Sequence, residues 1–169
     1  MALQSVVLDA STLILLAKTD LLQVWVDHVS ASTARVVYRE TTVKPEMYDA
    51  QLIARLVKDG KIRVETGESF YGLAKEIKKQ FKLDDGEAVA LALAKEKEAV
   101  LATDDGVAIK AAKILDIPFV TSLHVLGVLY DRKLLDAQSA LAKLDLLETF
   151  GRYGASLIAN VRMNIEKGG

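Results

Sequence analysis

The stretch "AVLATDDGVAIKAAKILDIPFVTS", residues 99–122, decides the fold of this chain. Its apolar run 99–102 predicts a short buried strand, and a helical pattern over 106–115 separates that strand from a second one over 118–121. Strands that alternate with helices of about ten residues favour a parallel sheet covered by helices on both faces. We therefore predict an α/β fold.

Two carboxylates, Asp104 and Asp105, stand directly after the first of these strands. Neighbouring negative charges repel, so such a pair persists where the side chains are solvated, protonated, capping a helix or neutralised by a cation. Both residues also suit a helix N-terminus, where the helix dipole favours anions. The pair alone does not distinguish a helix cap from a cation site, so the rest of the sequence is needed.

The same alternation extends in both directions. Strand patterns occur at 6–8, 29–32 and 61–66, and helical patterns at 11–18, 20–28, 33–43, 45–60, 69–82 and 84–99. After residue 122 the pattern is helical throughout, over 123–134, 136–150 and 154–168. We find neither a repeat nor a linker, and we predict one domain over 1–169, with a core over about 4–130 and a helical C-terminal extension over about 131–169.

The composition narrows the class of protein. Hydrophobic residues make up 51% of the 169 residues, enough for a sizeable core. The absence of cysteine excludes disulfides, cysteine-ligated zinc and a thiol nucleophile. Residues 1–8 lack the pattern of a signal peptide and no apolar run reaches transmembrane length, so we expect a cytoplasmic protein that does not bind a membrane.

The charge of the chain gives no general affinity for nucleic acid, because the net charge is -1 and the isoelectric point about 6.1. A nucleic-acid partner would need local positive charge, or cations recruited by acidic groups. Arg35 and Arg39 share a helix face, and Lys110 follows the acidic pair, so these three residues are candidates for contact with a phosphate backbone. A solvated helix face explains them equally well.

Acidic residues fall where strands of the predicted sheet end. Asp9 closes the first strand, as Asp104 and Asp105 close the later one, and Glu40 and Glu87 lie on neighbouring helices. Ligands of open parallel sheets bind outside the carboxyl ends of the strands. We therefore hypothesise that these acids converge into one pocket, whose hard oxygen ligands suit Mg²⁺ or Mn²⁺.

Each acid also has a structural explanation. Asp9 precedes a helical segment and suits its N-cap. Asp84 and Glu87 have the spacing of a capping box. Either Asp104 or Asp105 suits the cap of the following helix, and Glu40 suits a solvated helix surface. Taken singly, no acid distinguishes these explanations from a metal site.

Four segments together resemble the PIN-domain family. They are "VVLDASTLILLAK" (6–18), "ARVVYRET" (34–41), "DDGEAVALALAKE" (84–96) and the stretch from 99 onward that runs through "TSLHVLGVL" (121–129). Their order and intervals resemble the prokaryotic branch of PIN-domain proteins, which includes the nuclease toxins of toxin–antitoxin pairs. The resemblance covers residues 4–130 well and the helical tail more loosely.

The resemblance implies a three-layer PIN-like fold and a Mg²⁺- or Mn²⁺-dependent endoribonuclease, with an RNA substrate and a possible antitoxin partner. The catalytic acids that it implies are Asp9, Glu40, Glu87 and Asp105. It implies metal ligation by Asp9, Glu87 and Asp105, with Asp104 as a further candidate, and support from the hydroxyls of Ser11 and Thr103. Two positions depart from the family pattern: Glu87 stands where many members have Asp, and Thr33 where many have Pro.

Other functions and partners stay open. A non-catalytic nucleic-acid- or protein-binding module would use the same fold, and a small-molecule phosphohydrolase would need a second acid where Ser11 stands. Apolar helix positions exceed what one small sheet requires, so we expect a homodimer face or a groove for a partner helix. These positions are Leu13, Leu16, Leu21, Leu22, Val24, Ile53 and Leu56.

Overall fold

The computed structural model describes residues 3–168 and confirms the α/β fold. Its five strands are all parallel and lie in the order β3-β2-β1-β4-β5. They are β1 (Ser5–Leu8), β2 (Ser30–Ala34), β3 (Ile62–Glu65), β4 (Val100–Ala102) and β5 (Phe119–Val120). Every strand pattern expected from the sequence therefore corresponds to a strand of one sheet.

Helices connect and follow these strands. They are α1 (Ala10–Lys18), α2 (Leu22–Val26), α3 (Arg35–Thr41), α4 (Tyr48–Lys58), α5 (Tyr71–Phe81), α6 (Asp85–Glu96), α7 (Gly106–Ile114), α8 (Ser122–Asp131), α9 (Ala137–Phe150) and α10 (Ala155–Gly168). Boundaries differ by at most three residues, as at α4, which was expected from residue 45 and begins at Tyr48, after a turn in which Met47 N–H bonds to the Lys44 carbonyl.

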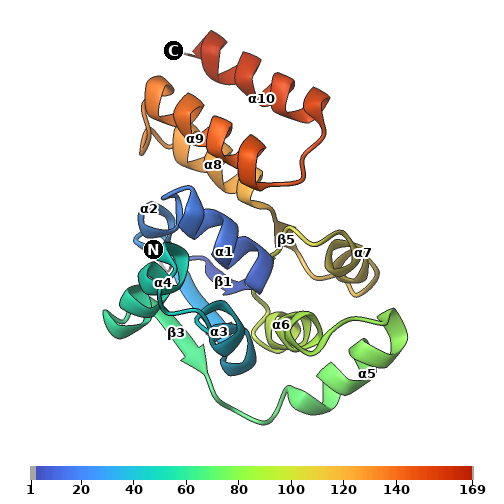
Figure 1. The fold of residues 1–169 in the computed structure, drawn as a ribbon. Helices are drawn as coiled ribbons and strands as arrows, with labels where there is room; N and C mark the ends of the chain where they lie inside the picture. The colour runs from blue at the N-terminus through green and yellow to red at the C-terminus, as the bar shows by residue number, and fades with distance from the viewer. Residues whose placement is uncertain (1–2, 169) are drawn as a thin grey trace.

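The strand order produces three layers (Figure 1). The chain moves from β1 to β2 to β3 in one direction and then crosses back to β4 and β5. Because parallel crossovers are right-handed, this reversal puts the helices on opposite faces of the sheet. Helices α1, α2 and α4 lie on one face together with α8, and α5 and α6 lie on the other, with α7 beside α6.

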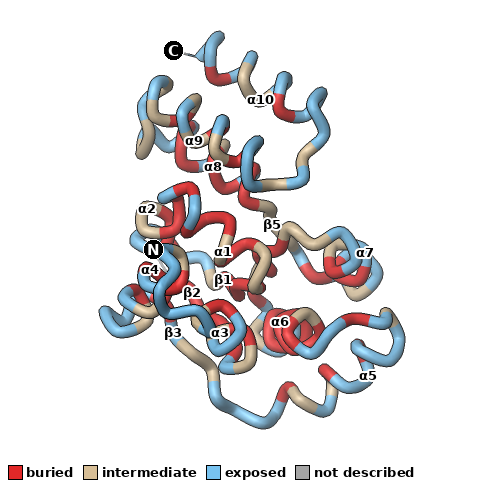
Figure 2. The backbone as a smooth tube through the Cα atoms, viewed as in Figure 1, coloured by how far each residue is buried: buried red, intermediate tan, exposed pale blue. Residues whose placement is uncertain are grey.

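The core is densest around α6 and the two central strands (Figure 2). All residues from Ala88 to Ala94 are buried, because α6 is covered by the sheet on one side and by α3 and α5 on others. A helix that is apolar all round fits this enclosed position. The burial of α6 fixes its N-terminus at the carboxyl end of β1 and β4.

The C-terminal helices cover the apolar face that was expected to form a dimer contact. Six of the seven positions named for that face have an exposed fraction of at most 1%, and Val24 is half-buried. Helix α4 packs against α1, and α8 and α9 also contact α1, so this surface is internal to one chain. These positions are covered within one chain and therefore give no support to a dimer contact, so the homodimer stays a prediction.

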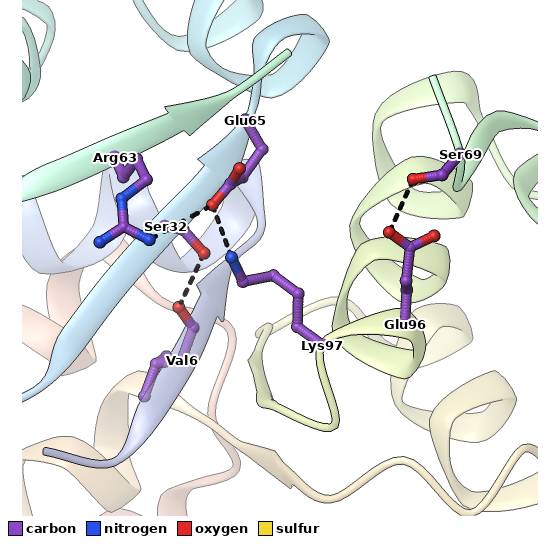
Figure 3. A network of polar contacts seen from close by, with 7 residues as sticks. All are labelled: Val6, Ser32, Arg63, Glu65, Ser69, Glu96 and Lys97. Atoms are coloured by element: carbon purple, nitrogen blue, oxygen red, sulfur yellow. Dashed lines mark hydrogen bonds and ion pairs between the residues drawn. The ribbon is translucent and has the colours of Figure 1, made fainter. Parts of the chain in front are cut away.

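Polar contacts tie the outer elements to this core. Lys97, just after α6, places its ammonium 2.6 Å from Glu65 Oε1 on the edge strand β3, and Arg63 lies 3.8 Å from the same oxygen (Figure 3). At the other end of the molecule, α10 packs against α9, and the Tyr130 hydroxyl of α8 donates to the Ile165 carbonyl at 3.0 Å. The extension is thus anchored as a stack on α1.

Candidate functional site

Asp9 lies at the point where the strand order reverses. Its backbone N–H bonds to the Ala102 carbonyl at 3.0 Å, which joins the carboxyl ends of β1 and β4. A crevice forms at such a switch point because the connections on either side leave toward opposite faces. The first helix begins directly after Asp9, and the Ala10 N–H donates to Asp9 Oδ1 at 2.8 Å. Asp9 is therefore the N-cap of α1 as well as the central acid of this edge.

The Asp9 carboxylate is 2% exposed and is held by two hydroxyls. Thr103 donates to Oδ2 at 2.8 Å, and Ser11 lies 3.3 Å from the same oxygen. Burial raises the pKa of Asp9 to about 6, although the bonds from Thr103 and Ala10 act in the opposite direction. Ser11 and Thr103 thus lie where the sequence placed them, on the first acid.

Asp105 caps the helix that follows β4. Its Oδ1 accepts from the N–H groups of Val107 at 2.9 Å and Ala108 at 2.8 Å. Among the described residues, Oδ2 accepts no hydrogen bond, so this oxygen is available for a ligand. The cap and a role in the site are compatible, because each uses a different oxygen of the same carboxylate.

Glu87 and Asp84 form the expected capping box at the start of α6. Asp84 Oδ1 accepts from the Glu87 N–H at 2.8 Å, and Glu87 Oε2 accepts from the Asp84 N–H at 3.2 Å. Burial raises the pKa of Glu87 to about 7 against the effect of that last bond, and the negative charges of Asp105, Asp84 and Asp9 raise it further. The capping box therefore lies close enough to Asp9 and Asp105 for their negative charges to act on Glu87.

Glu40 reaches the same place from α3. A β-carbon built on Gly86 would lie 2.8 Å from Glu40 Oε2, so the carboxylate rests against the first turn of α6 and needs a glycine there. Partial burial, and then the charge of Asp84, raises the pKa of Glu40 above its ordinary value. The structure thus brings together Glu40, Glu87, Asp9 and Asp105, all four acids that the family motifs imply.

Asp84 is the acid that sequence reasoning missed. Its charge acts on Asp9, Glu40 and Glu87, so it lies among them. The sequence identified Asp84 as a helix cap, which is correct, and gave no second role to it. The signal was its position one helical turn before Glu87, because two carboxylates at that spacing enter the same field.

Asp104 has a different environment from the other acids. Its carboxylate accepts from the hydroxyls of Thr12 at 2.7 Å and Ser122 at 2.5 Å, from the Ser122 N–H at 3.1 Å, and from the Tyr153 hydroxyl. These donors come from α1, α8 and the α9–α10 connection. Asp104 therefore joins three helical segments to the end of β4, and nothing local in the sequence indicated Tyr153.

We call Asp9, Glu40, Asp84, Glu87 and Asp105 the acidic cluster. Within the described residues, no lysine, arginine or histidine forms a salt bridge with any of the five. Glu65, by contrast, has Lys97 and Arg63 beside it (Figure 3). The cluster therefore carries negative charge that the protein itself does not neutralise.

The donor set fits a hard divalent cation, since carboxylate and hydroxyl oxygens are the ligands that Mg²⁺ and Mn²⁺ prefer. Across residues 3–168, no three acidic or histidine side chains already stand in a geometry ready to hold one ion. Glu40 is exposed and Glu87 half-buried, so these two side chains have room to turn toward a cation. Binding would thus draw the long glutamates onto the fixed Asp9.

The three basic candidates lie on exposed helix surfaces around this edge. Arg35 opens α3, Arg39 follows one turn later, and Lys110 lies on α7. All three are exposed, and none forms a salt bridge within the described part of the chain. Their exposure leaves contact with a phosphate backbone as a prediction.

The fold and the acidic cluster define an α/β protein with its site at the switch point. The family model DUF3368, described as a PIN domain, matches residues 5–166. This chain therefore belongs to the PIN-domain family, as its motifs predicted. PIN domains are typically nucleases, a class of hydrolase, and generally use divalent metal ions.

A solved structure supports the same fold. The crystal structure of PAE2754 from Pyrobaculum aerophilum is similar with a TM-score of 0.51 and 17% sequence identity, over 72% of this chain and 92% of that one. No curated protein matches this chain in sequence. No helix within residues 3–168 is long and apolar enough to cross a membrane.

Proposed function

We propose that this protein is a Mg²⁺- or Mn²⁺-dependent endoribonuclease whose site is the acidic cluster. The observation that carries the proposal is the meeting of five carboxylates from four segments of the chain at the switch point, without a basic partner in the described chain. A buried carboxylate such as Asp9 is costly without a compensating charge. A role in phosphodiester cleavage would explain why the chain keeps a carboxylate at this unfavourable position.

The proposed roles of these residues follow from how deeply each carboxylate is buried. Asp9, fixed by Thr103 and Ala10, would hold the metal at a defined point, and Glu87 and the second oxygen of Asp105 would complete the protein ligands. When bound, the metal supplies charge that polarises a phosphoryl oxygen and orients the attacking water. Glu40, the exposed acid, would accept the proton of that water. Asp84 adds negative charge beside them.

We assign Asp104 to positioning in this proposal, not to metal ligation. Both of its oxygens already accept hydrogen bonds, from Thr12, Ser122 and Tyr153. A carboxylate with these bonds would have to lose them to turn toward a metal. Asp104 instead keeps the end of β4 in place, and with it the neighbouring Asp105.

The test uses purified protein and a mixture of structured and single-stranded RNA, with Mn²⁺ or with a chelator. We expect cleavage with the metal, no cleavage with the chelator, and at least about a hundredfold slower cleavage by Asp9→Asn. Asp85→Asn is the matched control, because this neighbouring carboxylate faces Lys78 at 2.7 Å and lies outside the acidic cluster. Equal cleavage by wild type and Asp9→Asn would contradict the proposal.

Three further measurements separate the alternative functions. RNA binding without Mn²⁺ binding in calorimetry would favour a non-catalytic module on the PIN fold. Turnover of a phosphomonoester that Asp9→Asn abolishes would favour a small-molecule phosphohydrolase. A toxin role predicts that expression of the wild type arrests growth and that Asp9→Asn relieves the arrest. An antitoxin partner would then be expected to restore growth.

A further inference from the structure

A recess lies directly beside the acidic cluster. It has a volume of about 440 Å³ and is lined by one face of α1, by the Asp104–Gly106 segment and by the α9–α10 connection at residues 150–152. Asp105 belongs both to its wall and to the acidic cluster. The recess therefore adjoins the cluster at Asp105, and its other wall belongs to the C-terminal extension.

The wall formed by α1 and the connection is basic. Lys18 and Arg152 both line the recess and are exposed. Neither forms a salt bridge within the described residues. The recess thus has carboxylates at one side and uncompensated cations at the other, although the whole chain has a net charge of -1. That distribution suits an anion whose reacting group is at the cluster and whose next phosphate is at the cations.

An aromatic ring lines the same recess as these cations. Phe150 ends α9 with 50% of its surface exposed, so part of its ring is accessible from the recess that it lines. The Lys18 ammonium lies 5.7 Å from the centre of its ring. An exposed ring with a cation nearby is the arrangement on which unpaired bases stack in proteins that bind single strands.

The connection that carries Phe150 and Arg152 is held in place at the site. The Tyr153 hydroxyl donates to Asp104 and accepts from the Leu123 N–H at 3.3 Å. At Gly151 a β-carbon would lie 2.6 Å from the Leu147 carbonyl oxygen and 2.7 Å from the Tyr153 ring, so the turn is tight. The ring of Phe150 and the guanidinium of Arg152 therefore belong to a segment that is held against the rest of the chain.

We propose that this recess is a nucleotide subsite for single-stranded RNA, in which an unpaired base stacks on Phe150 and the adjoining phosphate contacts Arg152 and Lys18. The proposal rests on the proposed ribonuclease function and adds to it the residues that would hold one nucleotide of an unpaired strand. A base inside a duplex does not expose the face that Phe150 needs. The ring and the guanidinium of the subsite come from the C-terminal extension and Lys18 comes from α1, whereas the basic candidates Arg35, Arg39 and Lys110 are on α3 and α7.

The test measures binding of a fluorescent single-stranded RNA by anisotropy in chelator, where cleavage does not interfere. We expect Phe150→Ala to weaken binding roughly five- to a hundredfold, with Phe150→Trp close to wild type. Arg152→Ala should weaken binding and reduce the dependence of log K on log salt by about 0.7, the value for one phosphate contact on a single strand. Phe150→Ala should leave that salt slope unchanged.

A matched control is available in the same chain. Lys113 lies 5.7 Å from the ring of Phe119, the same separation as in the Lys18 pair, and neither residue lines the recess. We expect Lys113→Ala to bind RNA as the wild type does. Wild-type affinity in Phe150→Ala, or an equal loss in Lys113→Ala, would overturn the subsite. So would equal binding of a fully paired duplex.

The outcome is distinguishable from failure of the proposed function. Cleavage that depends on Asp9 but not on Phe150 would remove the subsite and keep the ribonuclease. Binding that depends on Phe150, without any cleavage in Mn²⁺, would keep the subsite and remove the ribonuclease. Thermal unfolding of each variant shows whether it is folded, and the half-exposed position of Phe150 predicts little change in stability.

Discussion

Asp9 and Glu87 are both proposed metal ligands, and burial makes the charged form of each carboxyl group less favourable. The pKa of Asp9 rises from an ordinary value of 3.8 to about 6, and that of Glu87 from 4.5 to about 7. The folded protein therefore keeps these protons to higher pH than the unfolded chain does. The two acids contribute stability below pH 3.8 and 4.5 that is lost as pH rises through about 6 and 7.

This shift predicts the pH dependence of stability without metal. In chelator, we expect the melting temperature to fall between about pH 5 and about pH 7.5, because the unfolded chain has already released both protons there. Scanning calorimetry of wild type, Asp9→Asn and Glu87→Gln measures the slope. Each substitution should flatten it, and Gln at position 87 keeps the capping box. An unchanged slope in the combined variant would show that other groups cause the fall.

Gly86 makes a separate prediction, because its missing side chain leaves room for Glu40. An Ala at 86 would meet Glu40 Oε2, the free end of a flexible side chain, and would otherwise suit a helix. We expect Gly86→Ala to change the free energy of unfolding by less than about 1 kcal/mol while slowing RNA cleavage by about tenfold or more. Gly72→Ala on α5, with no atom within 4 Å, is the control. Equal cleavage rates in the two variants would argue against Glu40 as a working acid.

At the scale of elements, the connection between α9 and α10 sets the position of one wall of the site. Gly151→Ala would place a β-carbon against the Leu147 carbonyl and the Tyr153 ring. We expect a loss of about 1–3 kcal/mol in stability, typical of a steric insertion at a packed position. Gly154→Ala, three residues on and without neighbours within 4 Å, should be nearly neutral. Urea unfolding of both variants tests this, and equal midpoints would contradict it.

The strands and helices were predictable because their patterns are local. Alternating short apolar runs and helical segments predicted every element of the sheet, and spacing identified Asp84 as a cap and narrowed the cap of α7 to Asp104 or Asp105, of which the structure shows Asp105. The cover of α1 by α8 and α9 was not, since an apolar helix face looks the same whether its partner is another chain or a distant part of its own. The role of Asp104 likewise depends on Tyr153, which is 49 residues away in sequence.

For the whole molecule, metal binding and folding should be coupled, because the acidic cluster exists in the folded state. We expect Mn²⁺ to raise the melting temperature, with about 2.7 kcal/mol of added stability at a hundred times its dissociation constant. Differential scanning fluorimetry of wild type, Asp9→Asn and Asp85→Asn measures the effect. Asp85→Asn should respond as wild type, and Asp9→Asn should respond weakly. A shift of the same size in all three would indicate metal binding elsewhere.

The family motifs identified four acids of the cluster from sequence, and the field that these acids share required the structure. Asp9, Glu40, Glu87 and Asp105 come from segments spread over most of the chain, and their order alone does not show that their charges interact. The basic recess was missed for a related reason. Lys18, Phe150 and Arg152 have no common motif, and they meet because α9 lies across α1.

The bond between Asp104 and Tyr153 has a consequence for the order of synthesis. A ribosome makes all five acids of the cluster before it reaches Tyr153, so a nascent chain carries the acids while the far wall of the recess is still missing. If the α9–α10 connection binds RNA as proposed, a nascent chain that lacks it binds the translated messenger RNA and the ribosomal RNA only weakly. The late synthesis of Tyr153 would then delay the onset of activity until well after the last acid of the cluster has been made.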